Sequence, residues 1–251
     1  MGPPIGSCRM TRFTVRAFTD VGLLRKRNED AVLVAGWQCQ THDGSLVTMD
    51  FAPAPPFVCA VADGMGGHAG GDLASRVALS VIAQVCAGWR GPEDVFSALE
   101  NASEHVRAVG AGNDLGGLGT TVAGLCFLAD RLLAFNVGDS RIYSITGGVV
   151  GQISIDDSVF DSAGRPTNII TQSLGQPDPV RPHVQALPLL PGTYLMCSDG
   201  VSGMMSADEL ATAVLQDDLD HCAERIIETT RANGAEDNFS FLIVDVAPTG
   251  S

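Results

Sequence analysis

Short runs of apolar residues, typical of β-strands, dominate the two ends and the middle of the chain. They are rich in Val, Ile, Thr, Phe and Leu, and turn-forming residues such as Gly, Asp and Asn separate them. The sequence predicts strands over residues 13–20, 31–35, 56–63, 119–128, 131–139, 141–146, 193–199 and 239–246. Short turns at 129–132 and 146–149 indicate that neighbouring strands pair as antiparallel hairpins.

Four other segments repeat apolar residues every three or four positions, which is the spacing of an amphipathic helix. The first covers 73–85, and the second covers 95–106 after Pro92, a residue suited to a first helical turn. The third begins at Ser206, where a glutamate three residues later completes a capping box. The fourth covers 219–227.

The elements therefore follow the order strands, two helices, strands, two helices and a final strand. Antiparallel sheets covered by helix pairs would bury these apolar stripes, so we predict a layered α+β fold. We expect one domain over residues 11–247, a disordered lead-in over 1–10 and a short tail over 248–251. Residues 155–183 show the weakest pattern and are predicted to form a surface loop.

Composition narrows the class of protein. With 251 residues, of which 45% are apolar, the chain can bury a large core. Its net charge of -14 argues against nucleic-acid binding, which depends on clustered Lys and Arg. Seven cysteines without a C-x-x-C pair indicate free thiols in a reducing compartment. No apolar run is long enough to span a membrane. We expect a cytoplasmic monomer that binds neither membrane nor nucleic acid.

Four aspartates lie where an apolar run ends or is about to begin, each beside a small or amide residue: Asp63, Asp139, Asp199 and Asp237. Any one of them is ordinary turn chemistry. Four together suggest carboxylates that converge at one rim of the domain, where they would repel one another unless a cation lay among them. Oxygen ligands without spaced His or Cys favour Mg²⁺ or Mn²⁺. Four unrelated turns remain the alternative.

A second polar cluster runs from Arg25 to Asp30, where the sequence RKR is followed by NED. Such a cluster can hold a phosphate with an arginine fork and orient metal-bound water with its carboxylates. It can equally be a solvated loop with weak local salt bridges. The segment itself does not decide between these two interpretations.

Six motifs, taken together, resemble those of the metal-dependent PP2C-like (PPM) protein serine/threonine phosphatases, in the compact bacterial form. In chain order they are Arg25-x-x-Asn28-Glu29-Asp30, DGMGG from Asp63, GTT from Gly119, GDSR from Gly138, SDG from Ser198 and EDN from Glu236. The match extends over about residues 11–246. It implies a four-layer α-β-β-α sandwich and hydrolysis of phosphoserine and phosphothreonine in proteins.

The resemblance also implies a two-metal site, in which two Mn²⁺ or Mg²⁺ ions share a water that attacks phosphorus. Asp63 matches the carboxylate that bridges both ions, and the Gly64 carbonyl matches a backbone ligand. Asp199 and Asp237 match the remaining protein ligands of one ion. Asp139 matches a ligand of a third, weaker metal seen in some members.

Further matches concern the phosphate and the metal-bound waters. Arg25 stands four residues before Glu29, the offset of the family's phosphate-binding arginine, whereas Arg27 has the wrong offset and is the second choice. Glu29 and Asp30 match groups that hold waters around the ions. The expected partners are phosphorylated proteins, including a Ser/Thr protein kinase or its substrates.

Two features depart from the family pattern. Many eukaryotic members carry, at the position of Met65, a histidine credited as general acid, so a metal-bound water would have to protonate the leaving group here. His68 is nearby, but an ordinary loop histidine is the favoured interpretation. The flap between Asp157 and Asn168 looks shortened. Two alternatives stay open: a weakly catalytic or non-catalytic regulatory module, and a phosphatase of small metabolites.

Overall fold

The computed structural model describes most of the chain in five stretches: residues 11–40, 44–65, 70–113, 117–162 and 166–248. Three features expected from the sequence lie outside these stretches. They are the disordered lead-in over 1–10, the last three residues of the tail, and His68.

One antiparallel sheet of six strands contains both ends of the described chain. In sheet order, its strands are β10 (Val149–Gln152), β9 (Arg141–Thr146), β14 (Gly192–Cys197), β15 (Phe239–Pro248), β1 (Thr11–Asp20) and β4 (Val47–Phe51). The last strand, β15, lies between β14 and β1 and pairs with β1 over ten residues. The N-terminal and C-terminal strands are therefore partners in the middle of this sheet.

A second antiparallel sheet packs against the first. In sheet order, its strands are β13 (His183–Pro188), β8 (Arg131–Val137), β7 (Val122–Phe127), β5 (Phe57–Met65), β2 (Asp30–Val34) and β3 (Trp37–Cys39). A two-residue strand, β6 (Gly119–Thr120), pairs with the end of β5. The register of β2 and β5 sets Asp30 directly opposite Asp63, so the pairing brings two predicted site residues together.

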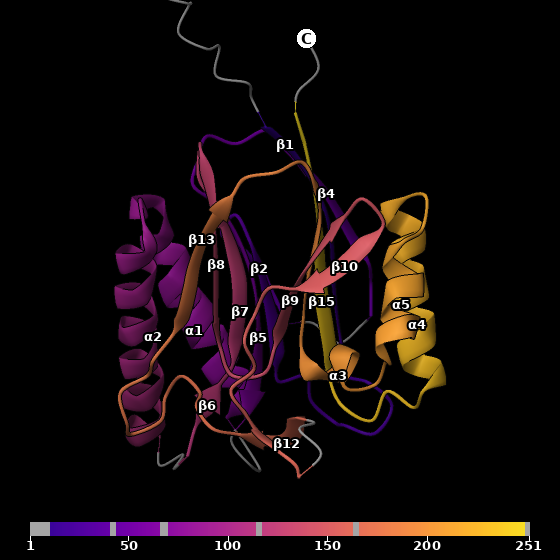
Figure 1. The fold of residues 1–251 in the computed structure, drawn as a ribbon. Helices are drawn as coiled ribbons and strands as arrows, with labels where there is room; N and C mark the ends of the chain where they lie inside the picture. Colours follow the sequence, from indigo (N-terminus) through magenta and orange to yellow (C-terminus); the bar gives the residue numbers. More distant parts are fainter. Residues whose placement is uncertain (1–10, 41–43, 66–69, 114–116, 163–165, 249–251) are drawn as a thin grey trace, which may run out of the picture.

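Helix pairs cover the outer face of each sheet, and Figure 1 shows the resulting four layers. The pair on the second sheet is α1 (Gly71–Val85) and α2 (Pro92–Gly112), joined through the 3₁₀ turn η1 (Cys86–Gly88). The other pair is α4 (Ala207–Val214) and α5 (Leu219–Ala232), and the short α3 (Asp199–Ser202) follows β14. The predicted four-layer α-β-β-α sandwich is confirmed.

Three hydrophobic clusters fill the three spaces between the four layers. Between the sheets, Phe13 stacks on Phe57 with ring centroids 4.4 Å apart. Under α1 and α2, Trp89 meets Phe135 edge-on at 5.5 Å. Each fully buried large side chain contributes roughly 1.5–3 kcal/mol relative to an exposed one. The sandwich therefore forms a rigid frame for the loops at its ends.

All eight predicted strands and all four predicted helices are present, but the expected surface loop over 155–183 is partly wrong. It contains a small antiparallel hairpin of β11 (Ser158–Phe160) and β12 (Pro166–Ile170). These strands are too short for their side chains to show a clear alternation along the sequence. The hairpin lies at the end of the sandwich that carries β6 and α3 (Figure 1).

Among the described cysteines, Cys59, Cys126, Cys197 and Cys222 are buried and Cys86 is half-buried. In the described stretches, no helix combines the length and the apolar character that crossing a membrane requires.

Candidate active site

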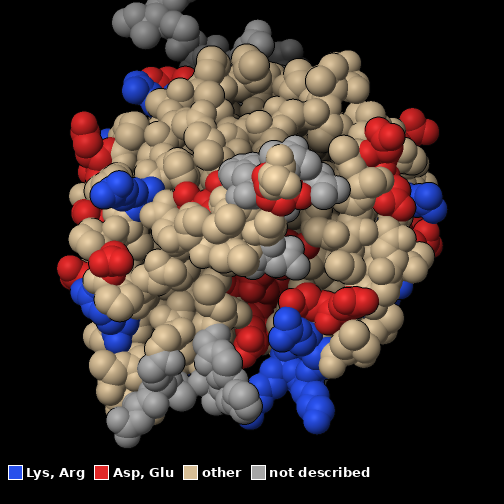
Figure 2. Space-filling view, turned by 60° about the horizontal axis from the view of Figure 1, so that its bottom comes forward, with Lys and Arg blue, Asp and Glu red and all other residues tan. Residues whose placement is uncertain are grey.

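An open pocket of about 800 Å³ lies at the end of the sandwich opposite the chain termini. Six predicted site residues line it: Arg25, Glu29, Asp63, Gly64, Asp199 and Asp237. Figure 2 looks onto this end of the molecule and shows carboxylates in a hollow with a group of cationic side chains at its edge. Arg25 and Glu29 come from the loop after β1, Asp63 and Gly64 from the end of β5, Asp199 from the start of α3, and Asp237 from the loop before β15.

Asp63 lies near the end of β5, where hydrogen bonds from two threonines hold its backbone. Its N–H donates to Thr121 Oγ1 at 3.1 Å, and its carbonyl accepts from Thr120 Oγ1 at 2.8 Å. Thr121 Oγ1 lies 2.7 Å from the buried hydroxyl of Ser140. The GTT and GDSR motifs therefore meet behind Asp63 and hold its backbone in position.

The backbone after Asp63 approaches its neighbours so closely that only glycine fits. A Cβ on Gly64 would lie 2.0 Å from the Gly71 carbonyl oxygen and 2.6 Å from that of Glu29. The Gly64 N–H donates to the Glu29 carbonyl at 3.1 Å. The turn thus places Gly64 and Glu29 side by side at the pocket wall.

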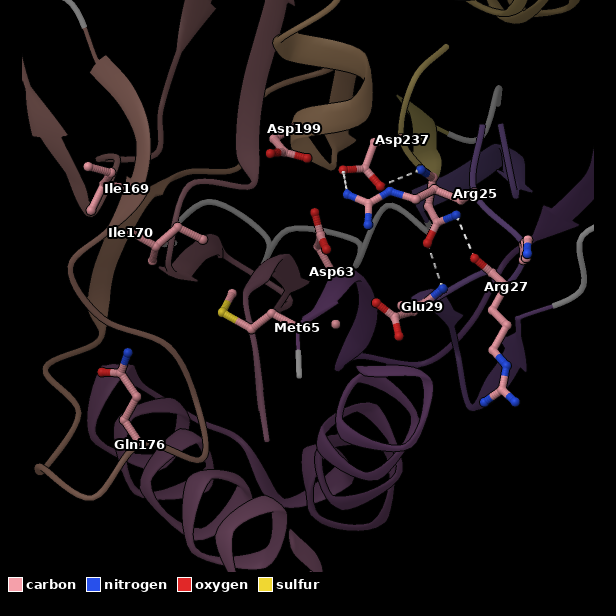
Figure 3. Close-up of a pocket in the computed structure, with 13 residues that line it drawn as sticks. Arg25, Arg27, Glu29, Asp63, Met65, Ile169, Ile170, Gln176, Asp199 and Asp237 are labelled. Carbon is pink, nitrogen blue, oxygen red and sulfur yellow. Dashed lines mark hydrogen bonds and ion pairs between the residues drawn. The ribbon is translucent and has the colours of Figure 1, made fainter. Parts of the chain in front are cut away.

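The carboxyls of Asp63, Asp199 and Asp237 surround one space in Figure 3. Burial, followed by the charges of Asp30 and Asp199, raises the pKa of Asp63 well above its ordinary value. Burial also raises the pKa of Asp199, whose carboxyl lies within hydrogen-bonding distance of Asp63. Without a cation among them, these two carboxyls would share a proton.

Arg25 and Arg27 have different environments, although only one residue separates them. Arg25 Nη2 donates to Asp237 Oδ2 at 2.6 Å, which places its guanidinium in the pocket. The side chain of Arg27 extends away from Asp63 (Figure 3). The geometry therefore favours Arg25 over Arg27 as the group able to contact a phosphate near the carboxylates.

Glu29 and Asp30, adjacent in sequence, occupy different depths. Glu29 lines the pocket, and burial together with the charge of Asp72 raises its pKa. Asp30 is fully buried behind the pocket, where its Oδ2 accepts from Ser198 Oγ at 2.7 Å. Burial raises the pKa of Asp30 to about 7. Because Ser198 immediately precedes Asp199, this bond ties the ends of β2 and β14 together.

Asp139 lies in an adjoining pocket of about 1090 Å³, separated from the first by Asp199 and Asp237. Burial raises its pKa to about 7, and the charge of Asp199 adds to the shift. The turn that carries Asp139 is held by Asp157, whose Oδ2 accepts from the Gly138 N–H at 2.8 Å. The other oxygen of Asp157 lies 2.8 Å from His183 Nε2 on β13.

Sequence reasoning assigned no role to Asn238, which holds the loop before Glu29 in place. Its side-chain oxygen accepts from the Glu29 N–H at 2.7 Å. Its amide nitrogen donates to the carbonyls of Val21 at 2.9 Å and Arg27 at 2.8 Å. Asn238, Ser198 and Ser140 each stand next to a predicted site aspartate in the sequence. This adjacency is the sequence feature that could have indicated their positioning role.

The donor set fits a hard divalent cation. Two buried carboxylate oxygens, Asp30 Oδ1 and Asp139 Oδ1, have no hydrogen-bond partner among the described residues. Within those same stretches, no three His, Cys, Asp or Glu side chains converge as direct ligands of one point. Such convergence is not required for Mg²⁺, because this ion keeps several waters and needs only one or two carboxylates as direct ligands. The Asp237 carboxylate is also turned toward Arg25 in this structure.

Met65 closes β5 and pairs with Gly119 of β6. It lines the pocket on the side of Ile170 and Gln176, opposite the cationic edge (Figure 3). Its thioether cannot donate a proton. Met65 therefore contributes an apolar wall at the position where the sequence comparison placed a histidine in other members.

Comparisons with known proteins agree with this geometry. The family model for protein phosphatase 2C matches residues 47–239. A putative protein phosphatase 2C-type protein of Streptococcus pyogenes is 30% identical over 73% of this chain and 83% of its own length. The serine/threonine protein phosphatase PstP of Mycobacterium tuberculosis is 30% identical over 92% of this chain, which spans 44% of PstP.

A solved structure of the PstP catalytic domain in complex with two manganese ions superimposes with a TM-score of 0.77. It is 28% identical, and the match covers 94% of this chain and 99% of that domain. Fold, site geometry and sequence similarity together define a phosphatase of the metal-dependent class. The chain belongs to the protein phosphatase 2C family.

Proposed function

We propose that this chain is a metal-dependent protein serine/threonine phosphatase that hydrolyses phosphoserine and phosphothreonine. The observation that carries the proposal is the meeting of Asp63, Asp199 and Asp237 with Arg25 in one open pocket. Asp63 would hold both ions and the Gly64 carbonyl would supply a backbone ligand, while Asp199 and Asp237 would complete the ligands of one ion. Asp139 would hold a third ion in the adjoining pocket.

Other residues of the chain would bind the phosphate, orient water and support the site. Bound Mn²⁺ or Mg²⁺ would lower the pKa of a water and neutralise phosphoryl charge. Arg25 would donate charge-assisted hydrogen bonds to the equatorial phosphoryl oxygens. Glu29 would orient water at the pocket wall, while Asp30 supports the site from behind through Ser198. Because Met65 has no proton to give, water would protonate the leaving alkoxide.

The decisive experiment measures turnover of p-nitrophenyl phosphate and of phosphothreonine peptides by the purified protein, with Mn²⁺ and with EDTA. We expect activity with Mn²⁺ and its loss with the chelator. Activity that survives chelation would contradict the two-metal site. Turnover of phosphopeptides would exclude a non-catalytic regulatory module, and a much higher kcat/KM for small phosphorylated metabolites would favour a metabolite phosphatase.

Arg25→Ala should lower kcat/KM for p-nitrophenyl phosphate by about 10- to 100-fold, because it removes charge-assisted hydrogen bonds to the phosphate. Steady-state kinetics with saturating Mn²⁺ would measure the effect. Arg12→Ala is the matched control, because Arg12 also pairs with an exposed aspartate, on the edge of the first sheet. An Arg25→Ala enzyme as active as the Arg12→Ala enzyme would contradict the assignment.

Removal of metal should make stability depend on pH in a defined direction. Burial raises the pKa of Asp30 and of Asp139 from 3.8 to about 7. Between about pH 4 and 7 the folded metal-free protein therefore keeps protons that the unfolded chain has released, so its free energy of unfolding falls as pH rises. Mn²⁺ binds the ionised carboxylates, so its stabilising effect should grow over the same range.

We expect the Tm of the EDTA-treated protein to fall by several degrees from about pH 5 to 7.5, since 1 kcal/mol shifts Tm by about 2–4 °C at this chain length. Asp139→Asn should reduce this slope, because an amide takes up no proton. Asp217→Asn, on an exposed turn, should leave it unchanged. A metal-free protein that becomes more stable with rising pH would contradict the prediction.

A further inference from the structure

The cationic edge of the pocket, formed by Lys26 and Arg27, is an uncommon feature of this chain. Lys26 is the only lysine among the 15 basic residues of a protein with a net charge of -14. Both residues are exposed and line the pocket beside Arg25. Figure 2 shows this group of cations next to the carboxylates in the hollow.

The loop that carries the two cations is fixed to the body of the domain. Leu23 N–H donates to the Ala235 carbonyl at 2.8 Å, and Asn238 holds the carbonyls of Val21 and Arg27. Gly22 adopts a left-handed φ of 74°, and a Cβ there would lie 2.1 Å from the Asp237 carbonyl oxygen. The backbone of this edge is therefore set in position before any substrate arrives.

Neither Lys26 nor Arg27 forms an ion pair with a carboxylate of the residues that the structure describes. Arg25, by contrast, pairs with Asp237. Arg27 extends away from Asp63, so it lies outside reach of a phosphate bound between Arg25 and the aspartates (Figure 3). The two charges face the space that substrate residues flanking the phosphoresidue would occupy.

Among the described residues, the opposite wall of the pocket has no charged side chain. It consists of Met65, Ile169, Ile170 and Gln176, and Ile169 is 62% exposed. A phosphopeptide crossing the pocket would therefore meet cations on one side of the phosphoresidue and apolar groups on the other. Complementarity of charge favours an acidic flank on the first side.

We propose that Lys26 and Arg27 form a specificity site for acidic side chains that flank the phosphoresidue on one side of protein substrates. The proposal rests on the proposed phosphatase function. Because the two cations lie at the solvent-exposed edge, we expect a moderate effect that salt weakens. At low ionic strength, an acidic flank should raise kcat/KM by about three- to tenfold over a neutral flank.

The test compares three phosphothreonine peptides: one with Asp and Glu on the N-terminal flank, one with them on the C-terminal flank, and a neutral one. Wild type should prefer one acidic peptide only. The double variant Lys26→Glu/Arg27→Glu should lose or invert this preference while keeping turnover of p-nitrophenyl phosphate. Arg76→Glu/Arg225→Glu, on exposed helical positions, changes the net charge equally and should keep the preference.

Three outcomes would overturn the proposal. They are an equal gain from both acidic flanks, an equal loss of preference in the control variant, and a parallel loss of p-nitrophenyl phosphate turnover in the Lys26→Glu/Arg27→Glu protein. The first two would indicate long-range attraction, and the third would place the two residues in the catalytic centre. Inactivity of wild type on all substrates would instead contradict the proposed function.

A second measurement does not depend on turnover. Because Lys26 is the only lysine, an amine-acetylating reagent can modify only this side chain and the α-amino group, which serves as the internal reference. The preferred acidic peptide, without phosphate, should slow acetylation of Lys26 at least threefold in mass-spectrometric measurements, and the neutral peptide should not. Equal rates with both peptides, or protection by anionic lipid vesicles alone, would overturn the assignment.

Discussion

Asp63→Ala should reduce Mn²⁺-dependent phosphatase activity by roughly 10³-fold, while the folded metal-free protein remains at least as stable as wild type. The loss of rate follows from the proposed role of Asp63 in holding both ions, because each charge-stabilising group of this kind accounts for several kcal/mol of the barrier. Steady-state kinetics on a phosphothreonine peptide would measure it.

The predicted stability of the metal-free Asp63→Ala protein follows from the raised pKa of Asp63, because the folded state disfavours the ionised form of this carboxyl. Near neutral pH the metal-free fold must keep Asp63 protonated while the unfolded chain releases that proton, so removal of the side chain should not lower the Tm in EDTA. The Tm increase that Mn²⁺ gives to wild type should shrink strongly. Asp217→Ala is the matched control, and it should retain both activity and the Mn²⁺ effect. An Asp63→Ala protein that Mn²⁺ stabilises as fully as wild type would contradict this role.

Gly64→Ala should lower the free energy of unfolding by about 3 kcal/mol or more, because overpacking a fixed backbone is costly. The added Cβ would meet the carbonyl oxygens of Gly71 and Glu29, which belong to α1 and to the residue before β2 and cannot move separately. At about 2–4 °C per kcal/mol, the Tm should fall by about 6–12 °C. Thermal unfolding followed by circular dichroism would measure the change.

Gly88→Ala provides the matched control for this substitution. Gly88 lies in the turn between α1 and α2, and a Cβ there would have no neighbour within 4 Å. Its Tm should stay within about 2 °C of wild type, because surface substitutions of this kind change stability by about 0.5 kcal/mol or less. If the two variants lost similar stability, the close approach at Gly64 would not be the cause.

The layers of this fold could be predicted from the sequence because long, strongly patterned segments form them. The stripe in 73–85 buries one face of its helix against the second sheet, and the run in 239–246 is buried on both faces, between the two sheets and under the helices of the first sheet. β11 and β13 could not be predicted, because β11 has only three residues and β13 is an edge strand without a buried residue.

The position of the site was likewise predictable, whereas its supporting bonds were not. Asp63 and Asp199 each come at the end of an apolar run in the sequence, so the sequence allowed the argument that strand ends converge. The depth of Asp30 depends on the pairing of β2 with β5 and on Ser198, 168 residues away in sequence. Contacts between such distant residues are set by topology, and local pattern does not encode them.

The central place of β15 has a consequence for how the chain folds. Because β15 lies between β14 and β1, the first strand has no partner on that side until the last strand has been made. Long-range pairing of this kind is slow to form and leaves strand edges exposed in the meantime. Asp237 and Asn238 immediately precede β15, so the event that completes this sheet also brings Asp237 and Asn238 to the candidate site. A growing chain would thus complete this pocket only after β15 has been made.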